Sequence, residues 1–226
     1  FFSTGDELVG LGQPLAPGQI YDSNRYSLYG MLTRLGTEVI DLGVIPDTRE
    51  AVRRAFASAA AQADVVITSG GVSVGEADYV KETLDEMGEV DFWRIAMKPG
   101  KPLAIGRLGQ ARFFGLPGNP VSVMATFYQF TQPALEKMMG TSPSPALVIP
   151  ARAAESLQKS PGRLEYQRGV LERDASGEWI VRSSGRQGSH ILTSMSRSNC
   201  FIILSAESSG ATAGETVWVQ PFHGLI

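Results

Sequence analysis

The sequence predicts an α/β fold in two parts: a three-layer, mainly parallel sheet domain at residues 1–145, and a small all-β, barrel-like domain at residues 146–226. Up to about residue 140, short apolar runs alternate with amphipathic stretches of helical length, which is the pattern of strand–helix–strand units. Residues 140–146, GTSPSPA, form a linker rich in proline and serine. Beyond it, short strand-like runs separated by turn signals continue without a long helix, which is typical of a sandwich or barrel.

Helix caps and apolar spacing define the elements of the first domain. A helix at 22–36 is capped by Asp22 or Ser23, and a second at 47–63 by Asp47 or Thr48. Ligands of such sheets bind beyond the carboxyl ends of the strands. The remaining predicted elements are helices at 79–87 and 119–139, strands at 37–43, 64–70, 90–97, 102–108 and 111–116, and, in the second domain, strands at 146–154, 164–173, 178–184, 190–195, 200–206 and 215–222.

Composition narrows the function classes. A net charge of −3 argues against bulk attraction to nucleic acid or to an anionic membrane. The single cysteine, Cys200, excludes an intramolecular disulfide and a cysteine-based zinc site, and it fits a reducing cytoplasm. No apolar run approaches the roughly 18 residues of a membrane span. Because the first residues, FFSTGDEL, look like the end of a strand, we interpret the chain as a fragment of a longer polypeptide.

Residues 68–79, TSGGVSVGEADY, join an apolar strand to an amphipathic helix. Gly70 and Gly71 let backbone N–H groups converge on a ligand. The loop also holds Gly75 and the hydroxyl groups of Thr68, Ser69 and Ser73. The start of the following helix adds a partial positive charge, so the loop suits a phosphate or a similar oxyanion. The same pattern also occurs where a strand simply turns into a helix, and both interpretations stay open.

Acidic residues follow three successive strand ends. Asp6 and Glu7 follow the first strand, Asp47 the second, and Glu76 and Asp78 the third. Helix capping can explain each acid separately, but it explains the set less well. Acids beside a phosphate-binding loop indicate a divalent cation, and Mg²⁺ is the default for oxygen ligands.

Prolines stiffen two further turns. MKPGKP places Lys98 and Lys101 around a Pro-Gly turn, either as a solvated turn or as a rigid pair of ammoniums for an anionic ligand. GLPGNPVS ends an apolar strand with Pro117 and Pro120 around Gly-Asn, and Ser122 follows in the first turn of a helix. Proline is ordinary at a helix start, but two prolines around Gly-Asn make an unusually stiff loop.

In this order, STGDEL, TSGGVSVGEADY, MKPGKP and GLPGNPVS, followed by a β domain, resemble the molybdopterin molybdenumtransferases of molybdenum cofactor biosynthesis, a group that includes the E domain of gephyrin. The resemblance covers nearly the whole chain. Related adenylyltransferases carry a Gly-Gly-Thr-Gly loop followed by Arg-Asp, whereas Val72-Ser73 stands at that point here. Family members begin with two further domains, so the resemblance implies only the catalytic α/β domain and the terminal β domain.

The resemblance implies hydrolysis of adenylylated molybdopterin in the presence of molybdate and Mg²⁺, giving molybdenum cofactor and AMP. It implies that Glu7, Asp47 and Asp78 are catalytic and hold the metal. It also implies a homodimer. The other positions that it implies are the catalytic residues Lys98, Lys101, Pro117 and Pro120, and the ligand-binding residues Ser69, Gly70, Gly71, Ser73, Gly75, Asn119, Ser122, Arg163 and Ser194.

A rival interpretation is a scaffold or molybdopterin-binding module that keeps the fold without turnover, as the receptor-clustering role of gephyrin illustrates. The intact acids and lysines favour the enzyme. No cysteine or histidine nucleophile stands near the motifs, which favours direct attack by water or molybdate over a covalent enzyme intermediate. The sequence does not distinguish molybdate from tungstate.

Overall fold

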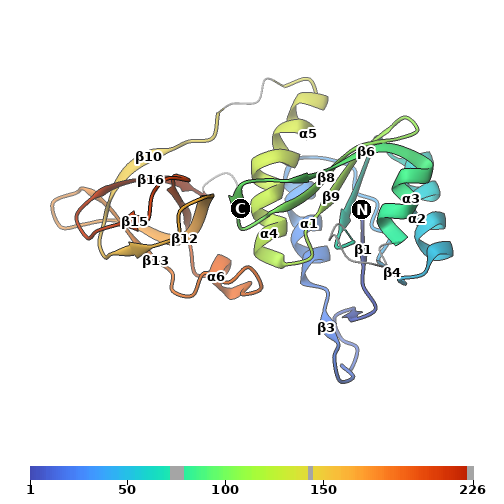
Figure 1. The fold of residues 1–226 in the computed structure, drawn as a ribbon, viewed down its shortest axis with the longest axis horizontal. Helices are drawn as coiled ribbons and strands as arrows, with labels where there is room; N and C mark the ends of the chain where they lie inside the picture. Colours follow the sequence, from blue (N-terminus) through green and yellow to red (C-terminus); the bar gives the residue numbers. More distant parts are fainter. Residues whose placement is uncertain (72–78, 142–144, 223–226) are drawn as a thin grey trace. The chain divides into compact units, whose positions relative to one another are not determined.

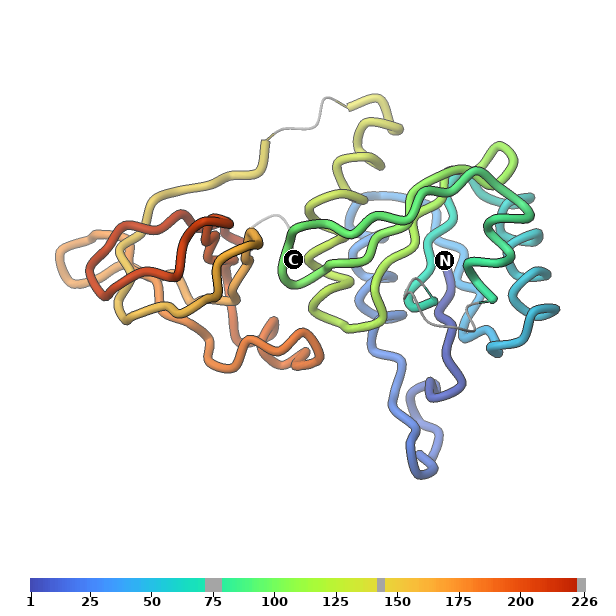
Figure 2. Tube along the Cα trace, viewed as in Figure 1, coloured from blue at the N-terminus to red at the C-terminus, as the bar shows by residue number. Residues whose placement is uncertain are grey.

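The computed structural model describes residues 1–71, 79–141 and 145–222, and the chain forms two compact units. The first unit comprises Phe1–Ile95 and Lys101–Phe127, and the second Ala96–Gly100 and Tyr128–Ile226. Figures 1 and 2 trace the chain by colour from residue 1 to residue 226. None of the helices in the described ranges is long and apolar enough to cross a membrane.

The first unit is built on a six-stranded sheet with the order β4-β1-β5-β9-β8-β6. The strands β4, β1, β5 and β9 are parallel, and β8 runs antiparallel to both of its neighbours. The mainly parallel sheet is therefore confirmed, with an antiparallel hairpin toward one edge. Its strands are β1 (Phe2–Thr4), β4 (Val44–Ile45), β5 (Val65–Ser69), β6 (Gly88–Arg94), β8 (Pro102–Leu108) and β9 (Ala111–Leu116).

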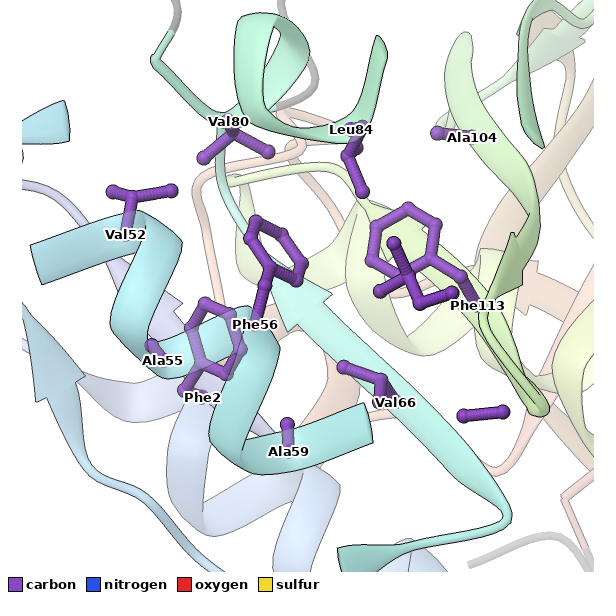
Figure 3. Close-up of a cluster of buried hydrophobic side chains, with 12 residues drawn as sticks. Phe2, Val52, Ala55, Phe56, Ala59, Val66, Val80, Leu84, Ala104 and Phe113 are labelled. Atoms are coloured by element: carbon purple, nitrogen blue, oxygen red, sulfur yellow. The ribbon is translucent and has the colours of Figure 1, made fainter. Parts of the chain in front are cut away.

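Helices cover both faces of this sheet, as Figure 1 shows: α1 (Ser23–Arg34) and α4 (Pro120–Thr126) on one face, and α2 (Arg49–Gln62) and α3 (Tyr79–Met87) on the other. Under α2 and α3, the Phe56 ring meets the rings of Phe2 and Phe113 edge to face, with centroids 5.1 and 5.7 Å away (Figure 3). Each such buried side chain contributes about 1.5–3 kcal/mol to folding. Two short parallel strands, β2 (Leu8–Val9) and β3 (Ile20–Tyr21), form an arm that projects from this unit (Figure 2).

The second unit is a small closed barrel. Its strands are ordered β13-β10-β16-β14-β12, and pairing of β12 with β13 closes the ring around an apolar core that includes Val181, Cys200 and Ile202. The predicted barrel-like domain is thus confirmed. Its elements are β7 (Met97–Lys98), η1 (Phe127–Thr131), α5 (Gln132–Met138), β10 (Ile149–Ala153), β11 (Leu157–Gln158), β12 (Leu164–Arg173), β13 (Trp179–Ser183), α6 (Thr193–Ser196), β14 (Cys200–Leu204), β15 (Gly210–Ala211) and β16 (Thr216–Pro221).

Two strand predictions were wrong. Residues 37–43 were expected to form a strand, but the strand that pairs with β1 is β4, which begins only at Val44. Before β4 the chain makes isolated backbone hydrogen bonds to the first residues, such as Leu42 N to Phe1 O. Gly43, with a φ of +79°, interrupts the extended backbone there. Residues 190–195 were also expected to be a strand, but they run into the helical turn α6, where Ser194 Oγ donates to Ile191 O.

The long helix predicted at 119–139 is divided. A π-helical segment, η1, separates α4 from α5. Pro133 has no N–H to donate to the carbonyl of Gln129, and its ring crowds that carbonyl, so a regular α-helical ladder cannot pass this point.

Candidate functional site

Four parallel strands of the first unit end side by side. Thr4 stands opposite Ile45, and Ser69 stands opposite both Ser3 and Leu116. The turns that follow these strands therefore lie along one edge of the sheet, which we call the rim. In spatial order the rim carries residues 46–47 after β4, residues 5–7 after β1, residues 70–71 after β5 and residues 117–120 after β9.

Three acidic residues follow β1 and β4 at one end of the rim: Asp6, Glu7 and Asp47. The backbone N–H of Asp47 donates to Asp6 Oδ1 at 3.1 Å. Burial, and then the negative charges of Asp6 and Glu7, raise the pKa of the Asp47 carboxyl above its usual value. The cap of α2 is Thr48, whose Oγ1 accepts from Ala51 N, so Asp47 is free of the capping role that the sequence left open.

Glu7 folds back over the turn that precedes it. A Cβ atom on Gly5 would lie 2.7 Å from Glu7 Oε2, and Gly5 has a φ of +148°. The positive φ favours glycine at this position. The close contact by itself is weaker evidence, because the Glu7 carboxylate is the end of a flexible side chain and could move aside.

Oxygen ligands of this kind suit Mg²⁺, which usually takes one or two protein carboxylates and completes its shell with water and phosphate oxygens. The chemistry of the acidic end therefore fits the metal. Within the described ranges, however, no three acidic, histidine or cysteine side chains form a ready-made metal cluster. Asp78, Ser73 and Gly75 lie outside the described residues, and their predicted roles stay predictions.

The centre of the rim is the Gly70-Gly71 turn. Both glycines have positive φ values, +91° and +66°, and a Cβ on Gly70 would lie 2.8 Å from Thr4 O. A Cβ on Gly71 would collide with the side chain of Val80. The fold alone thus requires both glycines, and they bring bare backbone to the middle of the rim.

The Pro117–Pro120 turn lies beside the glycine turn. Gly70 N donates to Leu116 O at 3.1 Å. Pro117 is buried, Pro120 begins α4, and Asn119 is exposed, with no hydrogen bond from its side chain to the helix that it caps. Ser122 is buried within α4. The stiff loop predicted from the two prolines therefore flanks the glycine turn, with the Asn119 amide free for a ligand.

Two cations stand at the other end of the rim. Lys101 directly precedes β8, and Arg94 ends β6 opposite Pro102. Both side chains are exposed. The sequence singled out Lys101 but missed Arg94, because its place at the rim follows only from the antiparallel pairing of β6 with β8.

Lys98 belongs to the second unit. Its Nζ lies 3.1 Å from Glu165 Oε1, and that carboxylate is 4% exposed. Gln167 Nε2 also donates to Glu165 Oε1. Lys98 is therefore paired with a buried carboxylate, although its own side chain is 43% exposed. Its predicted role in binding an anionic ligand stays a prediction.

A buried arginine stands further along β12. Arg168 is 1% exposed; its Nε donates to Ser194 Oγ at 3.0 Å and its guanidinium donates to Gly188 O at 3.1 Å. Burial lowers the pKa of Arg168 to about 10, against the opposing effect of Glu165. Arg163, which the family resemblance implied, is exposed, and its role stays a prediction. The sequence signal for Arg168 is the polar run Glu-Tyr-Gln-Arg in the first half of a predicted strand.

Two family models match the chain. One, described as "Probable molybdopterin binding domain", matches residues 1–137. This chain belongs to that molybdopterin-binding family. The other, "MoeA C-terminal region (domain IV)", matches residues 150–222. The resemblance stated from the motifs is thus confirmed.

Curated relatives and solved structures agree. The chain is 50% identical over 225 residues to a molybdopterin molybdenumtransferase of Haemophilus influenzae, covering 99% of this chain and 56% of the relative. It is 35% identical to a protein of the same name from a Nostoc species, covering 96% and 51%. A molybdopterin biosynthesis MoeA protein from Pyrococcus horikoshii shares the fold with a TM-score of 0.82 and 32% identity, over 98% of this chain and 53% of that one. The chain thus spans about half the length of these relatives.

Proposed function

We propose that this chain carries the molybdenum-insertion chemistry of a molybdopterin molybdenumtransferase: cleavage of adenylylated molybdopterin, with release of AMP and insertion of molybdate. The observation that carries the proposal is the distribution of charge along the rim. Carboxylates stand at one end, the glycine turn lies in the centre, and Lys101 and Arg94 stand at the other end.

The dimensions of the rim suit such a substrate. Neighbouring strands lie about 4.8 Å apart, so the three steps from β1 through β5 and β9 to β8 span roughly 14 Å. A pterin joined through two phosphates to a nucleoside is an extended molecule of this scale. A single phosphate would occupy the central turn alone.

Each end of the rim has its own task. Glu7 and Asp47, with Asp78, would hold Mg²⁺, and when bound the metal offsets negative charge on the phosphates. Gly70 and Gly71 bring bare backbone to the substrate at the centre. Lys101 orients molybdate through charge-assisted hydrogen bonds. Water then attacks the phosphorus on the pterin side of the phosphoanhydride, the bond from that phosphorus to the bridging oxygen breaks, and AMP departs with that oxygen. The molybdopterin phosphate left behind is the acceptor of molybdenum from molybdate.

AMP release is the direct test. The chain is mixed with adenylylated molybdopterin, molybdate and Mg²⁺, and AMP is followed over time. Glu7→Gln should reduce the rate of AMP release at least 100-fold and remove its Mg²⁺ dependence. The reason is that Glu7 would help to hold the metal, and losing one group that stabilises charge in the transition state costs about 3 kcal/mol. Glu38→Gln, an exposed acid away from the rim, is the matched control and should leave the rate unchanged.

A scaffold or molybdopterin-binding module of the same fold is the second candidate. It is supported by the similarity of the chain to a gephyrin of Dictyostelium discoideum, with 32% identity over 250 residues. A chain that binds adenylylated molybdopterin but releases no AMP under any Mg²⁺ or molybdate concentration would support this candidate over the enzyme.

Assembly as a homodimer belongs to the same proposal. It is supported by the family resemblance, and light scattering coupled to size-exclusion chromatography measures it directly. A mass twice that of the 24.3 kDa chain is expected, and a monomer at micromolar concentration would contradict it.

A further inference from the structure

Asn24 is a buried polar residue that neither the motifs nor the proposed chemistry uses. It is the second residue of α1 and is only 7% exposed. The helix cap beside it is Asp22, whose Oδ1 accepts from Arg25 N. Asn24 therefore has no capping task, and its burial calls for another explanation because an amide without partners is costly inside a protein.

The side-chain nitrogen of Asn24 joins two turns of the rim. It donates to Ser69 Oγ at 2.8 Å, at the end of β5, and to Gly118 O at 2.6 Å, in the turn after β9. The two acceptors lie 45 and 94 residues away along the chain. One NH₂ group thus uses both of its hydrogens to connect the glycine turn with the proline turn.

Backbone contacts also join the two strand ends. Gly70 N donates to Leu116 O at the last step of the ladder. A Cβ on Gly118 would meet only Gly70 Cα, at 3.8 Å. At this approach two glycines face each other, so neither of them contributes a side chain to the contact. The Asn24 amide therefore supplies the contact that side-chain packing supplies elsewhere.

The same amide has an unused oxygen. Among the described residues, no donor reaches Asn24 Oδ1 or Asp22 Oδ2, and both atoms are buried. Since Oδ1 shares a carbon with the donating nitrogen, it lies beside the same two turns. The amide plane is thus set by its two donated bonds, and its acceptor is not involved in holding the fold.

We propose that Asn24 is a positioning residue that holds the Ser69–Gly70–Gly71 turn and the Pro117–Gly118–Asn119 turn in register, so that both turns meet one ligand as a single surface. This rests on the proposed function, which places the nucleotide-bearing substrate along the rim. Asn24 acts through these turns rather than by touching the reacting atoms.

The first test needs no ligand. Hydrogen exchange is measured by mass spectrometry on the folded chain and on Asn24→Asp, which keeps the shape of the side chain and replaces the donating nitrogen by an oxygen. Exchange at residues 69–71 and at residues 116–119 should accelerate together by about tenfold, since loss of a buried hydrogen bond costs about 1.4 kcal/mol. Acceleration at one turn alone, or at neither, overturns the proposal.

Two further variants keep the test decisive. Asn24→Ala removes the amide without adding a charge and should give the same paired acceleration if Asn24→Asp folds poorly. Ser27→Ala is the matched control: it lies on the same helix, and its hydroxyl donates only to Ser23 O. A general loosening of α1 would accelerate exchange in the control as well, and that result contradicts a specific role for Asn24.

The second test is binding of AMP by calorimetry. Asn24→Ala should weaken AMP about tenfold at a temperature where the variant is still fully folded, because the lost contact orders the turns that meet the nucleotide. A lower midpoint with unchanged AMP affinity overturns the positioning role. If the unsubstituted chain binds no AMP at all, the proposed function fails, while the exchange experiment still decides the role of Asn24.

Discussion

The rim of the first unit and the strand β12 of the second unit handle polar residues in opposite ways. At the rim, the acids and Lys101 are exposed and follow strand ends, and glycines shape the backbone between them. On β12, Glu165, Gln167 and Arg168 are buried within a strand, and each finds its partners in the protein. The rim leaves its groups open to ligands, whereas β12 joins them to one another.

This difference predicts two different effects of substitutions on the free energy of unfolding. An exposed charge at a turn costs little to keep, so its substitution changes binding more than stability. When one member of a buried hydrogen-bonded pair is removed, its partner stays buried without a hydrogen bond, and the free energy of unfolding falls. Substitutions of the buried polar residues of β12 should therefore lower the free energy of unfolding, whereas substitutions of exposed charged residues at the rim should leave it nearly unchanged and weaken ligand binding.

The largest expected effect is at Arg168. Arg168→Ala removes the donor to Ser194 Oγ and to Gly188 O and leaves a cavity, so the free energy of unfolding should fall by about 3 kcal/mol. Urea unfolding measures it. Arg163→Ala, an exposed arginine five residues earlier, should stay within about 0.5 kcal/mol of the parent chain. Equal losses for the two arginines would break the comparison.

The glycine turn is the exception at the rim. Gly71→Ala should cost about 3 kcal/mol, because the new Cβ adds left-handed strain to a collision with Val80. Gly18→Ala has a similar positive φ, +85°, but no atom within 4 Å of the new Cβ, and it should cost about 1 kcal/mol. Thermal unfolding of both variants measures the two losses of stability. The difference between them is the cost of the contact with Val80, because the backbone strain is common to both. A Gly71→Ala as stable as Gly18→Ala would contradict the close approach to Val80.

Lys101→Ala should leave stability unchanged and affect the oxyanion. A charge-assisted hydrogen bond contributes about 1.5–3 kcal/mol, so the molybdate concentration for half-maximal AMP release should rise about 10- to 100-fold. Lys137→Ala, an exposed lysine of α5, is the control. If Lys101→Ala weakens nucleotide and molybdate equally, the lysine is a general phosphate contact, and the assignment of molybdate to it is wrong.

The smallest expected effect is a pH dependence of the free energy of unfolding that comes from Cys200 in the core of the barrel. Burial raises the pKa of the Cys200 thiol to about 12, from 9.0. Above pH 9 the unfolded chain releases this proton while the folded chain keeps it, so stability present below pH 9 is lost as the pH rises. The loss between pH 8 and pH 10 should be roughly 1.3 kcal/mol.

Cys200→Ala supplies the control for that experiment. It lowers stability at every pH through its cavity, but it removes the pH-dependent part. Urea unfolding at pH 8 and pH 10 for both chains gives the difference. The same pH dependence in Cys200→Ala would show that another group is responsible.

The sequence by itself determined the layout of the rim. Parallel strands place their carboxyl ends at one edge of a sheet, so once DVVITSG and ARFFGL are recognised as buried strands, the turns after them must lie together. Gly70, Gly71, Pro117 and Pro120 were found in this way. The alternation of strands and helices and the β domain were predicted from the spacing of apolar residues and from turn residues such as glycine and proline. These are local patterns, so no knowledge of distant contacts is needed.

Only the tertiary structure decided which polar groups meet. Lys98 pairs with Glu165 across 67 residues, and Asn24 reaches Gly118 across 94. The interruption of the 119–139 helix and the helical turn at α6 also differed from the local pattern. Register, burial and the pairing of distant strands set these features, and a local pattern contains none of that information. A charged residue such as Arg168 looks the same in the sequence whether the fold exposes it or encloses it.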